Sequence, residues 1–154
     1  MRVGFYAGSF DPFTNGHLNI VKKASKLFDK VIVGMGVNPK KNRSFDKIQM
    51  KDAINTLFKN EGLLNCECVI YDGLTVDVAK KYGTTYLIRG IRNGMDYDFE
   101  ENLALVNEEI SGLDTLYLRA GEFGAISSSM VKELLYYGKD ASKYLPKEIF
   151  ELIK

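Results

Sequence analysis

The sequence reads Gly8-Ser9-Phe10-Asp11-Pro12-Phe13-Thr14-Asn15-Gly16-His17 between a short apolar segment, residues 2–7, and an amphipathic segment, residues 17–28. Glycines at both ends and an Asp-Pro pair inside are typical of a tight, shaped loop. The order therefore predicts a strand, a loop and the first turn of a helix. Because a helix N-terminus gathers free backbone N–H groups and the positive end of the helix dipole, this loop is a candidate phosphate site.

His17, the only histidine of the chain, closes this loop. Its imidazole would add a hydrogen-bond donor to the phosphate site, and we expect its charge to change near neutral pH. The alternative is that His17 is an ordinary first-turn residue on a surface helix.

Strand-like and helix-like segments alternate along the chain. Apolar segments, several of them rich in valine and isoleucine, predict strands at residues 2–7, 30–37, 66–71, 85–88 and 115–119. Amphipathic segments predict helices at residues 17–28, 45–59, 76–82, 96–111 and 127–137, and Pro146 opens a last short helix. We expect Ser44 to cap the second helix. This alternation predicts a single α/β domain over residues 1–154, with a Rossmann-like, doubly wound, parallel five-stranded sheet and helices on both faces.

The loops that follow the five predicted strands carry polar and glycine-rich chemistry. In such sheets ligands bind beyond the carboxyl ends of the strands. We therefore expect one ligand-binding rim, built from residues 8–17, 38–43, 72–75, 89–93 and 120–129.

Composition sets broad limits on function. The 154 residues are 45% hydrophobic and 27% charged, which is typical of a globular protein, and the net charge of +1 gives no overall field that favours nucleic acid. No apolar run is long enough to span a membrane, and the N-terminus does not resemble a signal peptide. Cys66 and Cys68 would share one face of a strand and could not bridge easily, so we expect reduced thiols in a cytoplasmic protein.

The motifs of several other enzyme classes are absent. The glycines at 34 and 36 lack the third glycine of a dinucleotide fingerprint, and Gly138-Lys139 lacks the upstream glycine and the Ser or Thr of a P-loop. One histidine and two near-adjacent cysteines argue against a structural zinc site. A Ser-His-Asp hydrolase would need a G-x-S-x-G elbow, which the chain does not contain.

Three ordered segments resemble known signatures. The run from Gly8 to His17 resembles the first motif of the nucleotidylyltransferase superfamily, in which a [T/H]-x-G-H tetrapeptide, here residues 14–17, binds nucleotide phosphates. Arg89-Gly90-Ile91-Arg92-Asn93 resembles the R-G-[IL]-R segment of the phosphopantetheine adenylyltransferases of bacterial coenzyme A synthesis. Residues 126–132, Ile-Ser-Ser-Ser-Met-Val-Lys, resemble their I-S-S-[ST]-x-[VIL]-[KR] segment. The resemblance extends to about Phe150.

This resemblance implies an activity and its ligands. The family joins ATP and 4′-phosphopantetheine to give dephospho-coenzyme A and pyrophosphate, by direct in-line attack of the pantetheine phosphate on the α-phosphate of ATP. It also implies a homohexamer built as a dimer of trimers, with coenzyme A as a feedback ligand. No cluster of aspartates in the sequence suggests a metal cage, so we expect Mg²⁺ to be carried by the ATP phosphates.

The resemblance also assigns roles to individual residues. His17 is the expected transition-state stabiliser, assisted by Lys41 and Arg92. The residues expected to contact ATP are Ser9, Phe10, His17, Gly90, Ile91, Arg92, Glu100, Phe123, Gly124, Ala125, Ile126, Ser127, Ser128 and Ser129. Those expected to contact phosphopantetheine are Ser9, Lys41, Thr75 and Arg89. Ser9 stands where many relatives carry threonine, and Phe123 where they often carry tryptophan.

Each assignment has a structural alternative. Arg89 and Arg92 could instead form ion pairs with Asp96 or Asp98, and Glu100 could be an exposed helix residue. Ser127, Ser128 and Ser129 could do no more than cap a helix. Lys40 could take the place of Lys41 at the substrate phosphate.

Alternatives also remain for the function as a whole. One is another small-molecule nucleotidylyltransferase, such as a cytidylyltransferase or a nicotinate-mononucleotide adenylyltransferase. The other is a nucleotide-binding regulator without catalytic activity.

Overall fold

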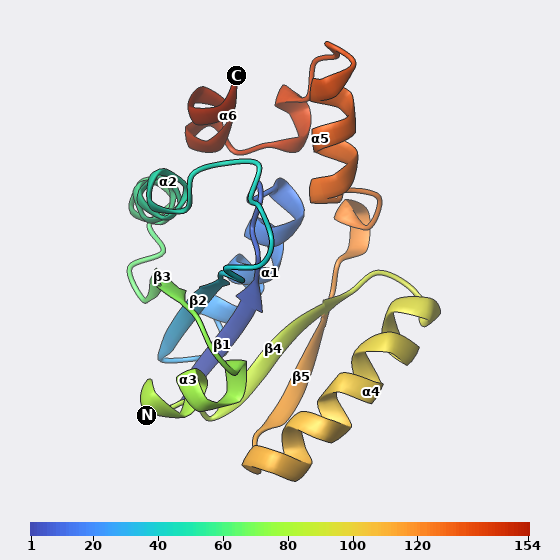
Figure 1. Cartoon of the computed structure of the whole chain (residues 1–154). Coiled ribbons are helices and arrows are strands. Elements are labelled where there is room, and N and C mark those ends of the chain that lie inside the picture. Colours follow the sequence, from blue (N-terminus) through green and yellow to red (C-terminus); the bar gives the residue numbers. More distant parts are fainter.

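A computed structural model describes residues 1–154, and it has a parallel five-stranded sheet at its centre (Figure 1). The strand order is β3-β2-β1-β4-β5. The strands are β1 (Val3–Gly8), β2 (Lys30–Gly36), β3 (Cys66–Tyr71), β4 (Tyr86–Ile91) and β5 (Asp114–Arg119). The helices are α1 (Asn15–Ser25), α2 (Lys47–Asn60), α3 (Thr75–Lys81), α4 (Gly94–Ser111), α5 (Ser128–Tyr136) and α6 (Lys147–Ile153), with two short 3-10 helices, η1 (Gly121–Phe123) and η2 (Ser142–Tyr144).

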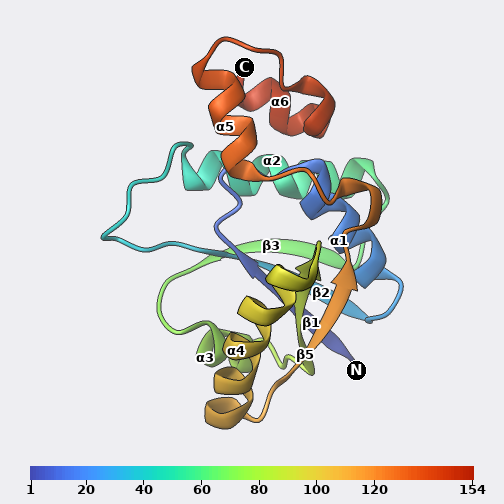
Figure 2. The same ribbon diagram turned by 90° about the vertical axis from the view of Figure 1, so that its right-hand side faces the viewer.

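Helices cover both faces of the sheet, as Figure 2 shows, so the predicted fold class is confirmed. Alternate strand residues point to opposite faces. On one face Tyr6, Val33 and Ile88 join a large core with α1, α2, α5 and α6. On the other face Phe5 and Ile32 join a smaller core with α3. The carboxyl ends of β1 and β4 lie side by side, since these strands pair in parallel.

The structure corrects several predicted boundaries. Helix α1 begins at Asn15 with Thr14 as its N-cap, two residues earlier than predicted, and it ends at Ser25. Helix α2 is capped by Asp46, whose carboxylate accepts from the N–H of Gln49 over 2.9 Å, so the prediction of a Ser44 cap is wrong. The two 3-10 helices were not predicted.

Strand β4 is longer than its apolar sequence suggests. It continues through Arg89, Gly90 and Ile91, which were expected in a loop, because each of them pairs in register with β5. The RGIR segment therefore begins inside the sheet, and only Arg92 follows the strand.

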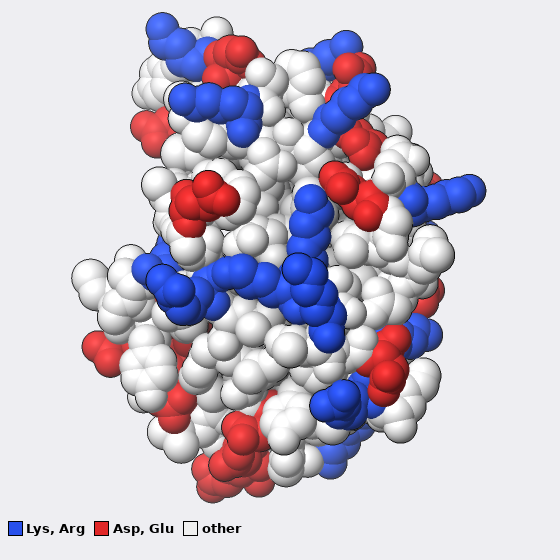
Figure 3. Space-filling view, turned by 180° about the vertical axis from the view of Figure 1, so that it is seen from behind, with Lys and Arg blue, Asp and Glu red and all other residues white.

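Charge is unevenly distributed over the surface. On the side opposite to the view of Figure 1, Lys and Arg form a band across the middle of the face, with acidic groups above and below it (Figure 3). Helix α1 carries Lys22 and Lys23 in its last turn, and the ammonium group of Lys23 donates to the carbonyl of Arg119. The model has no helix with both the length and the apolar character that a membrane span requires.

Candidate active site

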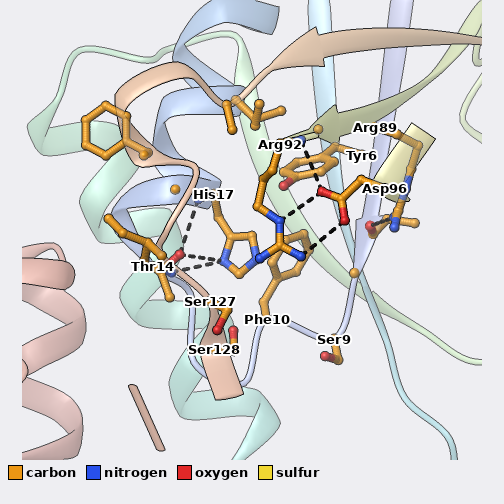
Figure 4. Close-up of a pocket in the computed structure, with 18 of the residues that line it drawn as sticks. Tyr6, Ser9, Phe10, Thr14, His17, Arg89, Arg92, Asp96, Ser127 and Ser128 are labelled. Carbon is orange, nitrogen blue, oxygen red and sulfur yellow. Dashed lines mark hydrogen bonds and ion pairs between the residues drawn. The ribbon is translucent and has the colours of Figure 1, made fainter. Parts of the chain in front are cut away.

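A cavity of about 340 Å³ lies at the carboxyl ends of β1 and β4, between α1 and the start of α5 (Figure 4). Three of the five loops predicted to form the rim, residues 8–17, 89–93 and 120–129, contribute to its lining, together with residues of β1 and α4. The loop at residues 72–75 contributes to a second cavity instead, and the loop at residues 38–43 lines neither. The predicted residues that line it are Ser9, Phe10, His17, Arg89, Gly90, Arg92, Glu100, Phe123, Ile126, Ser127 and Ser128.

Some predicted residues lie outside this cavity. Ile91, Gly124, Ala125 and Ser129 belong to the same segments but do not line it. Thr75 lines a second, adjoining cavity. Lys41 lines neither cavity, and its side chain is exposed in the loop between β2 and α2, as is that of Lys40.

His17 is held in the first turn of α1 by a reciprocal cap. Its Nδ1 accepts from the backbone N–H of Thr14 over 3.0 Å, and the Thr14 hydroxyl accepts from the backbone N–H of His17 over 3.4 Å. The ring packs edge-on against Phe10, with a centroid separation of 5.0 Å, and lies 5.4 Å from the ring of Phe13. The local sequence thus fixes the imidazole by backbone and aromatic contacts rather than by another charged group.

This environment determines the protonation state of His17. Burial, aided by the positive charge of Arg89, lowers its pKa to about 4. The expected change of charge near neutral pH is therefore wrong, because the packed ring cannot be solvated as a cation. Since Nδ1 accepts the Thr14 N–H, the single proton of the neutral ring belongs on Nε2. His17 is a neutral donor at physiological pH.

Two segments contribute free backbone donors to the cavity. The N–H groups of Ser9 and Phe10 donate to no protein acceptor, and neither do those of Ser128 and Ser129 at the start of α5. The Ser127 hydroxyl caps α5 by accepting from the N–H of Met130 over 3.1 Å, as the alternative interpretation predicted. Free N–H groups at a helix start attract anions.

Arg92 and Asp96 form an ion pair at the edge of the cavity. Nε of Arg92 lies 2.9 Å from Oδ2 of Asp96, which also accepts from the backbone N–H of Arg92 over 3.0 Å. The hydrogen bonds from Arg92 hold the pKa of the Asp96 carboxyl below its ordinary value. This ion pair is the predicted alternative to phosphate binding by Arg92. A phosphate bound by Arg92 would have to share the guanidinium with Asp96.

Arg89 is paired with Glu100, not with Asp96 or Asp98. Its Nε and Nη2 donate to the two carboxylate oxygens of Glu100 over 2.7 and 2.9 Å, and Nη1 donates to the carbonyl of Ala7 over 2.7 Å. Glu100 is buried, so the alternative that it is an exposed helix residue is wrong. The two parallel hydrogen bonds to Glu100 fix the guanidinium of Arg89. Arg89 lines both cavities and therefore lies between them.

The second cavity, of about 230 Å³, lies between the sheet and helices α3 and α4. It is lined largely by apolar residues, and it shares Ala7, Arg89 and Glu100 with the first cavity. Sequence reasoning missed Leu74, Leu103 and Asn107, which line it. Two of these residues could have been found from the sequence. Leu103 lies one helical turn after Glu100, and Asn107 lies one turn after Leu103, so all three share one side of α4.

The acidic residues of the site do not form a metal-binding cluster. No group of three or more His, Cys, Asp or Glu side chains in the chain is placed to hold a metal ion. In the first cavity Asp96 and Glu100 are each paired with an arginine.

Comparison with known proteins identifies the family. The model of the family described as cytidylyltransferase-like matches residues 5–134. A phosphopantetheine adenylyltransferase from Streptococcus suis is 43% identical over 156 residues, which cover 99% of this chain and 95% of that protein. An enzyme of the same name from Porphyromonas gingivalis is 39% identical over 146 residues, which cover 94% of each chain.

A solved structure shares the fold at low sequence identity. The bifunctional NMN adenylyltransferase/ADP ribose pyrophosphatase from Francisella tularensis superposes with a TM-score of 0.70 and 16% identity, covering 94% of this chain and 44% of that one. At this identity the likeness concerns the fold alone. The near full-length relatives are decisive, and the chain belongs to the phosphopantetheine adenylyltransferase family of cytidylyltransferase-like enzymes.

Proposed function

We propose that this chain transfers the adenylyl group of ATP to 4′-phosphopantetheine, giving dephospho-coenzyme A and pyrophosphate. The observation that carries the proposal is the pair of adjoining cavities. One is lined by candidate phosphate donors, and the other is smaller and largely apolar, which suits the pantetheine arm. They meet at Arg89, so a phosphate on the arm would face the triphosphate of ATP.

The proposed mechanism uses positioning and electrostatic stabilisation. A phosphate oxygen of 4′-phosphopantetheine attacks the α-phosphorus of ATP in line, the bond from the α-phosphorus to the bridging oxygen breaks, and pyrophosphate leaves. Charge on the α-phosphate oxygens is stabilised by Nε2–H of His17 and by the backbone donors of Ser9 and Phe10. Lys41 and Arg92 are proposed to hold the attacking and leaving phosphates. The attacking oxygen is already ionised at neutral pH, so no general base is required.

Mg²⁺ is proposed to enter with ATP. When bound, it would neutralise charge on the triphosphate oxygens. The paired state of Asp96 and Glu100 supports a metal carried by the phosphates and water.

A substrate screen tests this proposal against its alternatives. Purified enzyme is offered ATP or CTP with 4′-phosphopantetheine or nicotinate mononucleotide, and products are identified by mass spectrometry. We expect dephospho-coenzyme A from ATP and phosphopantetheine, and no product from the other three pairs. Product from CTP or from nicotinate mononucleotide would indicate another nucleotidylyltransferase. Binding of ATP without product from any acceptor would indicate a regulator.

We further propose a homohexamer, built as a dimer of trimers, with coenzyme A as a feedback ligand. Helix α4 supports self-association, because Met95, Phe99, Val106 and Ile110 recur on one stripe and each is more than half exposed. Coenzyme A carries the same pantetheine arm as the substrate, so the apolar cavity could accept it. A cytoplasmic location suits the two free cysteines.

A further inference from the structure

Arg43, in the loop between β2 and α2, contacts three backbone carbonyls. Its Nη1 donates to the carbonyl of Ser9, Nη2 to that of Phe10 over 3.2 Å, and Nε to that of Phe45 over 3.1 Å. The side chain is only 16% exposed, although it comes from a polar loop. Such use of all three nitrogens fixes the guanidinium in one position.

Asp11 makes the reciprocal contacts from the loop between β1 and α1. Its Oδ2 accepts from the N–H of Ser44 over 2.8 Å, and its Oδ1 accepts from that of Phe45 over 2.9 Å and lies 3.6 Å from Nη2 of Arg43. Each loop thus holds the backbone of the other through a charged side chain, which is buried for Asp11 and largely buried for Arg43. We call this arrangement, made by the side chains of Arg43 and Asp11, the clamp.

The clamp acts on the backbone that lines the first cavity. Phe10 has a φ of 47°, a left-handed conformation that is uncommon for an aromatic residue. Two of the carbonyls that Arg43 binds, those of Ser9 and Phe10, flank this torsion. The clamp therefore helps to hold the conformation in which the N–H groups of Ser9 and Phe10 stay free.

The clamp also anchors the loop that carries Lys41. The loop extends beyond the sheet (Figure 2), and the backbone N–H groups of Lys40 and Lys41 bind only to Asn38 within it. Arg43, two residues after Lys41, is the first residue beyond that turn to contact another element. The position of Lys41 relative to the cavity therefore depends on the clamp.

We infer that Arg43 is a positioning residue that anchors the loop carrying Lys41 to the Ser9–Phe10 backbone, so that Lys41 can bring the attacking phosphate to the α-phosphate of ATP. The inference rests on the proposed function, because it takes the attacking group to be the phosphate of 4′-phosphopantetheine. Arg43 itself does not touch the reacting atoms.

The first test compares Arg43→Ala with Lys47→Ala, which removes an exposed positive charge from the nearby start of α2. We expect Arg43→Ala to lower kcat/KM for phosphopantetheine by about 10- to 100-fold, because small misplacements of a reacting group are costly. We expect a smaller rise in the Kd for ATP, because the Ser9 and Phe10 N–H groups that the clamp positions are only part of the proposed ATP contacts. Lys47→Ala should match the parent. Parental kinetics in Arg43→Ala, or an equal loss for both substrates, would overturn the inference.

The second test asks whether Arg43 acts through Lys41. In a Lys41→Ala background, we expect Arg43→Ala to lower kcat/KM for phosphopantetheine by less than about threefold, because the group to be positioned is already gone. Arg43→Lys, which keeps the charge but not the fork, should lie between the parent and Arg43→Ala. Fully multiplicative losses in the double variant would contradict a positioning role through Lys41.

Amide hydrogen exchange separates this inference from the proposed function. In Arg43→Ala we expect a lower Tm, and faster exchange in residues 38–46 than in the parent or in Lys47→Ala, while exchange in the central strands β1 and β2 stays close to that of the parent. This readout does not require turnover, so it holds even if the chain makes no dephospho-coenzyme A. Unchanged exchange in these residues would show that Arg43 does not anchor the loop and would overturn the inference.

Discussion

At the scale of single residues, the site depends on partners that are distant in sequence or that use the backbone. His17 is neutral because burial of its ring, aided by the positive charge of Arg89, lowers its pKa. Arg89, in β4, pairs with Glu100, which lies eleven positions later in α4. The sequence motifs predicted which residue types gather at the cavity. They could not predict these pairings, because side-chain partners depend on helix rotation and strand length.

We predict that His17→Ala lowers kcat by at least about 10²-fold, since it removes a donor from the developing charge on the α-phosphate. The stability cost should be about 1–2 kcal/mol, because half of one helix cap and the ring contacts with Phe10 and Phe13 are lost. His17→Asn is the matched control for the cap, since its amide oxygen can still accept the Thr14 N–H while the Nε2–H is missing. Steady-state kinetics and urea denaturation measure both effects. A kcat within a few-fold of the parent would remove His17 from the mechanism.

The low pKa of His17 predicts a pH dependence of stability. The folded ring titrates at about 4, compared with 6.5 for an ordinary histidine, so between these values the unfolded state binds one more proton. The free energy of unfolding should therefore fall as the pH drops from 6.5 to 4, by at most about 1.4 kcal/mol per pH unit from this group. In urea denaturation at several pH values, His17→Gln should show a shallower fall. Equal slopes for both proteins would contradict burial of a neutral ring.

At the scale of elements, the alternation of apolar and amphipathic segments was sufficient to predict the sheet and its main helices. The same pattern did not predict where β4 ends or where α1 begins. Strand β4 extends through Arg89 and Gly90 because β5 supplies pairing partners for them, which hydropathy does not record. Helix α1 begins earlier because the Thr14 and His17 side chains cap it. Boundaries set by pairing and by capping geometry are tertiary properties.

Packing between strands makes a prediction about Gly34 in β2. A Cβ at this position would lie 2.4 Å from the ring of Phe5, which is fully buried. Gly34→Ala should therefore lower the free energy of unfolding by about 1–3 kcal/mol through overpacking. Gly94→Ala, at the start of α4, is the control, because a Cβ there meets nothing within 4 Å. Denaturant titration measures the free energy of unfolding of both variants. Equal values for Gly34→Ala and Gly94→Ala would contradict the close packing of Phe5 against Gly34.

At the scale of the whole molecule, the two cavities and the exposed stripe on α4 divide the surface into a ligand rim and a candidate assembly face. We predict that Val106→Lys dissociates the proposed homohexamer, because a charge would enter the proposed apolar interface. Glu108→Gln changes the net charge by the same amount on another face of α4 and should leave the mass unchanged. Light scattering measures both. An unchanged mass for Val106→Lys would exclude this stripe as the interface.

The measurement that tests the central claim most directly is pyrophosphate release from ATP and Mg²⁺, with and without 4′-phosphopantetheine. The two adjoining cavities predict release that requires phosphopantetheine and stops when it is exhausted, with one pyrophosphate formed for each dephospho-coenzyme A. No release by folded enzyme that still binds ATP, or release that is independent of phosphopantetheine, would contradict the proposed reaction.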